Sequence, residues 1–314
     1  MVQVGIDLGG SGSRIATSGG AFAAGPAFAV RDGRAEHAHV VRLLGAVLAF
    51  QAQPVTAVAV CAAGLIGLGD VDEIRFEVAR RWPEAPIAIV SDAVGAAVGA
   101  WGSAGGAVVA AGTGVVGFAT DLGELWRRSD GWGDTFGDDG GAAWIGRKGI
   151  AAALRAIDGR PGGSSRLLDA LRSEAGHDPY RLAEEVRASA NRASLLASFA
   201  PTVTRAAATD LVARTIVEAA ARHLADTGLS LIGDGVPQRL ALVGGLSEEA
   251  AIVGAFRAHV RGLRRDVQVE TGVGTPLDGA LALAELAGEG RLATHLPYLH
   301  FFPSTTPTET EGAS

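Results

Sequence analysis

The 314-residue sequence predicts an α/β protein built around parallel strands. Apolar runs at 55–62 and 87–90 have the length of buried strands, and an amphipathic helical pattern at 71–82 separates them. Strand, helix and strand in this order indicate parallel pairing with a right-handed crossover. Two strand–turn–strand segments with small-residue turns, at 2–16 and 107–119, indicate an internal repeat. The length fits two domains of about 150 residues each.

The composition is that of a globular protein and argues against several kinds of partner. Hydrophobic residues make up 48% of the chain and charged residues 19%, with a net charge of −7. Basic residues cluster only at 261–265, so the chain lacks the basic stripe of a nucleic-acid surface. No secretion signal is visible, and the apolar runs are too short to span a bilayer. We therefore expect a cytoplasmic protein without nucleic-acid or membrane partners.

The single cysteine and the histidines restrict the chemistry further. Cys61 excludes an internal disulfide and fits a reducing compartment. It falls in the predicted strand at 55–62, where we interpret it as a small core residue rather than a reactive thiol. The seven histidines show no paired spacing, so a metal site built on imidazole is not expected.

The first glycine-rich turn has the chemistry of an anion cradle. Glycines at 9, 10 and 12 let backbone N–H groups approach a phosphate. The turn lacks the lysine of a P-loop, and a strand rather than a helix follows it, so it is not a dinucleotide fingerprint either. Asp7, at the end of the first strand, is placed to hold the hydrated Mg²⁺ of a nucleotide. The alternative is a plain hairpin turn beside a solvated Asp7.

The second small-residue turn repeats this layout. Gly112, Thr113 and Gly114 join two apolar strands within 107–119. A single phosphate loop would not produce two such hairpins, so we interpret the pair as a clamp that holds a triphosphate from both sides.

Asp92 directly follows the predicted strand at 87–90 and opens a helix. Ligands of open parallel sheets bind at the carboxyl ends of the strands, so this carboxylate lies where chemistry is expected. The alternative is that Asp92 only caps the helix that follows.

The most unusual stretch is 131–150, which holds seven glycines, two tryptophans and three carboxylates. So many glycines are costly unless the backbone must bend sharply around something polar. The pattern becomes helical from Gly140 onward, which places Asp138 and Asp139 at the expected helix start. Either these carboxylates cap the helix or they bind a ligand.

Two further glycines follow a predicted strand at 239–243. Gly244 and Gly245 permit the close approach of a flat ring, and Ser247 can cap the next helix. The tail at 303–314, rich in Thr, Pro and Glu, is predicted to be disordered. The other predicted elements are a strand at 21–30, helices at 36–52, 93–101, 165–198 and 206–231, a strand at 267–269, and a helix from 275 to about 286.

Together these motifs resemble the sugar-kinase, Hsp70 and actin nucleotide-binding superfamily. Within it, they resemble the N-acetylglucosamine kinase and BadF/BadG ATPase branch. The resemblance implies two actin-like (ribonuclease H-like) domains that close on ATP and a sugar, at 1–105 and 106–300, with a disordered tail at 301–314. The motifs that carry it are 5–13, Asp92, 112–114, 131–133, 137–140, 144–147 and 243–245.

The resemblance also implies the nucleotide site. Asp7 resembles the aspartate close to Mg²⁺, and the nucleotide is ATP. The expected nucleotide-binding residues are Gly9, Gly10, Ser11 and Ser13 in the first phosphate loop, Gly112, Thr113 and Gly114 in the second, and Gly244 and Gly245 in the adenosine loop.

For the sugar, Asp92 resembles the catalytic aspartate that accepts the proton of the attacking hydroxyl. Asp138 resembles a carboxylate that binds sugar hydroxyls, with Gly131 and Trp132 lining the pocket, whereas Asp139 keeps the helix-start role.

The chain departs from the family pattern at three places. The family carries a sugar-binding Asn near a Gly-Pro pair, whereas Gly25-Pro26 is followed here by Ala-Phe-Ala. Asp139 and Gly141 replace the usual Glu and Ser, and we expect these two changes to be tolerated.

The predicted activity is transfer of the γ-phosphate of ATP to the 6-hydroxyl of N-acetylglucosamine, or alternatively of glucosamine. An activator-type ATPase would need cysteines for an iron–sulfur cluster, and Cys61 is the only one. A sugar-sensing regulator without catalysis is disfavoured because Asp92 is present and no DNA-binding extension is visible. Relatives imply a homodimer.

Overall fold

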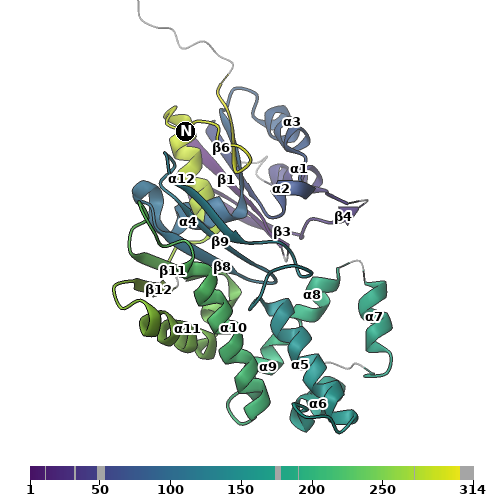
Figure 1. The fold of residues 1–314 in the computed structure, drawn as a ribbon. Coiled ribbons are helices and arrows are strands. Elements are labelled where there is room, and N and C mark those ends of the chain that lie inside the picture. Colours follow the sequence, from purple (N-terminus) through teal and green to yellow (C-terminus); the bar gives the residue numbers. More distant parts are fainter. Residues whose placement is uncertain are drawn as a thin grey trace, which may run out of the picture. The chain divides into compact units, whose positions relative to one another are not determined.

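The computed structural model describes residues 1–10, 12–31, 33–47, 54–173, 178–189, 191–271 and 273–304. The chain forms two compact units, Met1–Ser103 with Gly274–Ser314, and Ala104–Val273. Each unit contains a mixed sheet with helices packed on it (Figure 1). The predicted α/β class is confirmed in both units.

The first unit is built on a six-stranded sheet in the order β13-β7-β6-β1-β2-β3. β1, β6 and β7 are parallel and the other strands pair antiparallel. The parallel pairing predicted for 55–62 and 87–90 is therefore confirmed. The strands are β1 Val2–Leu8, β2 Ser13–Thr17, β3 Phe22–Gly25, β6 Val55–Ala62, β7 Ile87–Ser91 and β13 Leu299–Phe302, and a separate ribbon pairs β4 Val30–Arg31 with β5 Arg34–Ala35.

Side chains alternate between the two faces of this sheet. Val4, Ile6 and Leu8 of β1 join the apolar core with residues of α1 (His37–Val47) and α3 (Val71–Arg81). The opposite face packs against α4 (Asp92–Trp101) and α12 (Pro276–Gly288). The short α2 (Leu65–Leu68) and a 3₁₀ turn at Gly102–Ala104 complete the unit.

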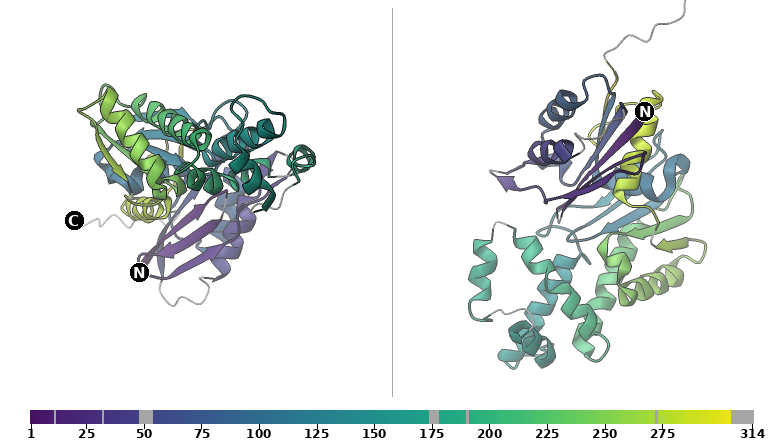
Figure 2. Two further views of the ribbon diagram at one scale, coloured as in Figure 1. Left: turned by 90° about the horizontal axis from the view of Figure 1, so that it is seen from below. Right: turned by 180° about the vertical axis from the view of Figure 1, so that it is seen from behind.

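The second unit has a five-stranded sheet in the order β10-β9-β8-β11-β12. Helices α6, α8 and α9 gather against α5 beside this sheet (Figure 2). The strands are β8 Ala107–Ala111, β9 Val115–Thr120, β10 Trp126–Asp130, β11 Arg239–Val243 and β12 Gln268–Thr271. The helices are α5 Ala142–Ile157, α6 Ser165–Ser173, α7 Leu182–Ala188, α8 Arg192–Ala197, α9 Ala200–Ala206, α10 Leu211–Leu229 and α11 Ala250–Leu263, with a 3₁₀ turn at Gly245–Glu248.

The internal repeat extends from the two turns to the whole sheet. In each unit an antiparallel meander of three strands continues into two further strands parallel to the first, giving β3-β2-β1-β6-β7 and β10-β9-β8-β11-β12. Two hairpins with small-residue turns therefore indicate a duplicated architecture, with β13 as an addition to the first unit.

The expected domain boundary at 300 is wrong. The predicted last helix belongs to the first unit, where α12 contacts β1, β6 and α4. The contact is close because glycines face each other: a Cβ built on Gly279 would lie 1.9 Å from the carbonyl oxygen of Gly95. Helical periodicity carries no information about which sheet a helix covers.

Other boundaries also differ from the sequence predictions. The helix expected at 206–231 begins at Leu211, because the Asp210 side chain accepts a hydrogen bond from the Ala213 N–H and caps it. Ser247 does not cap α11, whose N-cap is Glu249. Phe301 and Phe302, assigned to the disordered tail, pair with β7. Residues 48–52 of the expected helix at 36–52 and residues 305–314 of the tail lie outside the described residues.

We predict that Gly279→Ala destabilises the protein, because the new methyl group meets backbone that cannot move aside. Overpacking of this kind costs about 1–3 kcal/mol, and it opposes the gain in helix propensity. Urea unfolding measures the change. Gly254→Ala in α11 is the matched control, since a Cβ there meets open space, and it should stabilise by roughly 0.5–1 kcal/mol. Equal effects of both variants would contradict the prediction.

Candidate functional site

Each unit carries part of the predicted site, and the parts are described separately. In the first unit, Asp7 pairs in register with Cys61 across β1 and β6, and Ala62 pairs with Ser91 across β6 and β7. Asp7 and Asp92 therefore lie at the same carboxyl edge of the parallel strands. Burial is the main reason that the pKa of the Cys61 thiol is well above its usual range, and the charges of Asp7 and Asp92 raise it further. Cys61 is thus a buried, protonated core residue between two acids, as interpreted from the sequence.

Asp7 is a buried carboxylate, with 5% of its surface exposed. Burial raises its pKa, and Arg14, whose Nη1 lies 3.3 Å from Oδ2, partly opposes this. The alternative of a solvated Asp7 is therefore wrong. Among the described residues no group of three or more His, Cys, Asp or Glu side chains is arranged to hold a metal ion. A single buried carboxylate fits Mg²⁺ that keeps most of its own waters.

The first turn closes through its backbone, because the N–H of Gly9 donates to the carbonyl of Gly12 at 3.0 Å. Gly10 faces open space, and Ser11 lies outside the described residues. Ser13 opens β2 opposite Leu8, on the sheet face away from Asp7. Its buried hydroxyl has no hydrogen-bond partner within the described part of the chain.

Helix α4 is capped by Ser91 and not by Asp92. The Ser91 Oγ accepts a hydrogen bond from the N–H of Val94 at 3.4 Å. Asp92 is the first residue of the helix, half-buried, and its Oδ1 accepts from the N–H of Ala93 at 2.9 Å. The alternative that Asp92 is the N-cap of this helix is therefore wrong, and its carboxylate lies at the positive end of the helix dipole.

In the second unit, the turn at 112–114 rests on the start of α5. The N–H of Gly112 donates to the carbonyl of Gly114 at 3.0 Å. The carbonyls of Gly112 and Thr113 accept from the N–H groups of Ala142 and Ala143 at 2.9 and 3.0 Å. These hydrogen bonds of the turn join backbone groups, and none of them uses the Thr113 hydroxyl.

Gly244 and Gly245 lie beside this turn, because Val243 pairs with Ala110 across β11 and β8. Gly244 has φ 87°, and a Cβ on it would lie 2.6 Å from the carbonyl oxygen of Ala111. Gly245 faces open space. The predicted second phosphate loop and adenosine loop are thus neighbours at one edge of the second sheet.

Asp138 joins the glycine-rich run, defined here as residues 130–138, to the turn at 112–114. It has φ 57°, its N–H donates to Asp130 Oδ1 at 2.9 Å, and its carboxylate packs on Gly114. Burial is the largest cause of its raised pKa, and backbone N–H groups of Val115 and Gly133 partly oppose it. Neither Asp138 nor Asp139 caps α5, because its N-cap is Gly141, so the helix-start role expected for Asp139 is wrong.

The tryptophan of the run is exposed. Trp132 has 69% of its surface accessible, and the Arg128 guanidinium lies 4.8 Å from the centroid of its ring. Arg128 also donates to the carbonyl of Gly131. Phe136, four residues further along, is 87% exposed. The run thus presents two aromatic side chains at its surface.

Sequence reasoning missed Asp130, which organises this run. It has φ 59°, its carboxylate holds the N–H of Asp138, and it lies against Gly137. The Asp-Gly pair at 130–131 is a turn signal that could have indicated it.

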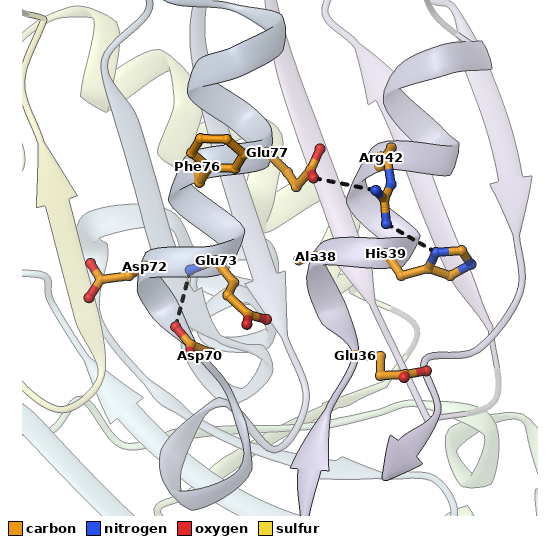
Figure 3. Close-up of a pocket in the computed structure, with 9 residues that line it drawn as sticks. All are labelled: Glu36, Ala38, His39, Arg42, Asp70, Asp72, Glu73, Phe76 and Glu77. Carbon is orange, nitrogen blue, oxygen red and sulfur yellow. Dashed lines mark hydrogen bonds and ion pairs between the residues drawn. The ribbon is translucent and has the colours of Figure 1, made fainter.

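A separate hollow of about 750 Å³ lies on the first unit between α1 and α3 (Figure 3). Its wall is acidic, and Arg42 bridges His39 and Glu77 there. None of the residues predicted to bind nucleotide or sugar lines it. The lining residues are Glu36, Ala38, His39, Arg42, Asp70, Asp72, Glu73, Phe76 and Glu77.

Two α/β units with one shared strand order, each with a tight hairpin turn beside the carboxyl ends of its parallel strands, define an actin-like protein of the sugar-kinase fold. Residues 4–287 match the model of the BadF/BadG/BcrA/BcrD ATPase family, and the chain belongs to this family. A search of curated protein sequences gives no match. No described helix is long and apolar enough to cross a membrane.

Solved structures agree with this assignment. A candidate N-acetylglucosamine kinase from Chromobacterium violaceum is 26% identical, with a TM-score of 0.65 and coverage of 90% of this chain and 98% of the other. A second candidate N-acetylglucosamine kinase, from Porphyromonas gingivalis, shares the fold at 19% identity, with a TM-score of 0.72 and coverage of 93% and 100%. A ROK family glucokinase from Streptomyces griseus, in complex with glucose and AMPPNP, shares it at 18% identity, with a TM-score of 0.55 and coverage of 92% and 100%.

We predict that Asp7→Asn changes stability in a pH-dependent way. The pKa of Asp7 is raised from 3.8 in the folded chain, so the folded state binds this proton more tightly than the unfolded state. Stability therefore falls as pH rises from about 3.8 through the raised pKa, and the Asn variant lacks this loss. The advantage of the variant in urea unfolding should grow with pH over that interval and then stay constant. A difference independent of pH would contradict the assignment.

We predict that Asp130→Ala destabilises the protein by about 1–3 kcal/mol, because the N–H of Asp138 loses its acceptor and alanine is strained at positive φ. Asp130→Asn keeps an acceptor oxygen and tolerates this backbone conformation, so it should cost less. Thermal and urea unfolding of the two variants separate the hydrogen bond from the charge. Equal losses would mean that the charge of Asp130 is what matters.

Proposed function

We propose that the protein is an ATP-dependent kinase that phosphorylates the 6-hydroxyl of an amino sugar, N-acetylglucosamine, with glucosamine as the alternative acceptor. The observation that carries the proposal is Asp92, a carboxylate at the carboxyl edge of parallel strands whose capping duty Ser91 performs. Membership of an ATPase family and a candidate N-acetylglucosamine kinase at 26% identity support ATP and a sugar as the substrates.

In the proposed reaction, Asp92 accepts the proton of the 6-hydroxyl while that oxygen bonds to the γ-phosphorus. The bond from the γ-phosphorus to the bridging oxygen breaks, and ADP leaves. A positioned carboxylate is the orienter and base that phosphoryl transfer uses. The carboxylate of Asp92 lies in the first turn of α4, where the helix dipole favours a negative charge.

Asp7 is the residue proposed to hold Mg²⁺, through waters. The ion would neutralise charge on the transferring phosphates. The burial of Asp7 without a second carboxylate partner in register supports a ligand that supplies most of its own coordination shell.

The two turns of the second unit, at 112–114 and 244–245, are the proposed phosphate and adenosine loops on that unit. The backbone at Gly244 closely approaches the end of β8, at Ala111. Gly245 faces open space, where a flat ring is proposed to lie. Gly9, Gly10 and Ser11, with Ser13, form the other proposed phosphate loop.

For the sugar, Asp138 is proposed to accept hydrogen bonds from hydroxyls, with Gly131 and Trp132 beside it. The exposed indole supports this role, because the apolar face of a pyranose packs on aromatic rings. The rival activator-type ATPase is disfavoured, since Cys61 is fully buried and is the only cysteine. The homodimer stays a prediction.

We predict ADP release that depends on the sugar, measured by a coupled assay across glucose, glucosamine, N-acetylglucosamine, N-acetylmannosamine and N-acetylmuramate. N-acetylglucosamine should give the highest kcat/KM. Asp92→Asn should lower kcat by about 10²–10⁴-fold and leave ATP binding unchanged. Asp72→Asn, at the start of α3, is the control and should be neutral. Turnover on none of the sugars would refute the kinase, and an active Asn variant would refute Asp92 as base.

A further inference from the structure

We propose that Arg192, on helix α8, is a positioning residue that sets sugar affinity by holding the glycine-rich run against helix α5. The inference rests on the proposed sugar kinase function and adds a residue from outside the run to its sugar site. It concerns the second unit alone, and no family motif found in the sequence includes Arg192.

The run is anchored at its ends, and the bonds of its middle are made within the run. Asp130 and Asp138 tie its two ends together, as described above. Between them, the bonds of 133–137 are internal, with the N–H groups of Phe136 and Gly137 donating to the carbonyl of Gly133 at 3.2 and 2.8 Å. Gly133 has φ 82° and faces open space. A turn closed on itself through such a glycine can swing unless a group outside the run holds it.

Arg192 supplies that contact. Its Nε donates to Asp134 Oδ2 and its Nη2 to Asp134 Oδ1, both at 3.0 Å. This two-bond geometry fixes orientation as well as distance, which a single charge contact does not. The pair is partly exposed, with side-chain accessibilities of 48% for Arg192 and 28% for Asp134. Its net contribution to overall stability is therefore small.

Helix α8 is a firm base for this contact. A Cβ on Gly146 of α5 would lie 1.8 Å from the carbonyl oxygen of Leu196, so the backbones of α5 and α8 nearly touch. A cavity of about 10 Å³ lies between the run and these helices. Its wall includes Asp134, Asp138, Arg147 and Leu196. The Arg192–Asp134 pair thus connects the run to helix α8, which itself packs closely on α5.

Asp134 lies between the two side chains proposed to meet the sugar, two residues after Trp132 and four before Asp138. When the pair is broken, the run occupies several positions and only a fraction of molecules presents both groups together. The apparent affinity is the intrinsic affinity multiplied by that fraction, so the apparent Kd rises as the fraction falls. The turn at 112–114 keeps its own backbone bonds to α5, so nucleotide binding should not change.

The test compares Arg192→Ala with the parent protein in steady-state kinetics. The KM for N-acetylglucosamine should rise by about 5–10-fold, with the KM for ATP and the Tm unchanged. Arg187→Ala is the matched control, because Arg187 makes an exposed ion pair with Glu184 on the neighbouring α7, away from the run. Arg192→Lys should recover only part of the affinity, since an ammonium cannot make both bonds in this geometry.

The charge-exchanged double variant Asp134→Arg with Arg192→Asp should restore the KM for the sugar. If either residue acted alone and not as a pair, exchanging the two charges would not restore this KM. Hydrogen exchange of the peptide 131–141 should be faster in Arg192→Ala, and this measurement needs no turnover. Unchanged exchange, or equal rises in both KM values, would overturn the inference. A parent protein that phosphorylates no sugar would instead refute the proposed function, while the exchange data would still decide whether Arg192 orders the run.

Discussion

The half-buried carboxylate of Asp138 makes the contact that joins the glycine-rich run to the rest of the second unit. Asp138 adopts a left-handed backbone conformation, gives its N–H to Asp130, and places its carboxylate on Gly114 among the N–H groups of Val115 and Gly133. Burying a carboxylate is costly, and backbone donors offset that cost only where the chain is bent to present them. The glycines of the run permit this bend. The residue proposed to bind the sugar therefore also contacts the proposed phosphate turn, which keeps its own backbone hydrogen bonds to the start of α5.

The first unit places its acids differently on the same strand order. Asp7 and Asp92 come from neighbouring positions along the carboxyl edge of β1, β6 and β7, with the Cys61 thiol close to both. The parallel strands need no side chain to form this edge, which leaves its polar positions available for chemistry. The duplicated sheet thus provides two similar edges, and the side chains added to each edge differ: buried acids in one unit, and a glycine-rich run with exposed aromatic residues in the other.

Local patterns predicted the elements well and their partners poorly. The strands at 55–62 and 87–90 were predictable because buried parallel strands are continuously apolar. Helix α12 was assigned to the wrong domain, since its place depends on backbone contact between Gly279 and Gly95, 184 positions apart in the numbering. Serine and aspartate are both common N-cap residues. Ser91 caps α4 because its backbone is extended, whereas Asp92 is already the first helical residue. The Arg192–Asp134 pair joins residues 58 positions apart and leaves no local signal.

The chain lacks the Asn that the family resemblance led us to expect near Gly25-Pro26. The segment after Gly25 supplies Phe28 instead, and its ring packs 4.3 Å from the His37 ring, centroid to centroid. His37 in turn donates from Nε2 to the carbonyl of Ala63 at 2.9 Å, and burial lowers its pKa. An aromatic pair fixed to the end of β6 offers the sugar no amide. In the proposed site, recognition of hydroxyls is assigned to the glycine-rich run, where Asp138 contacts backbone N–H groups and Trp132 is exposed. Under the proposed function, we therefore expect the position of that run to decide substrate choice, and this is the reason to test the contact from helix α8.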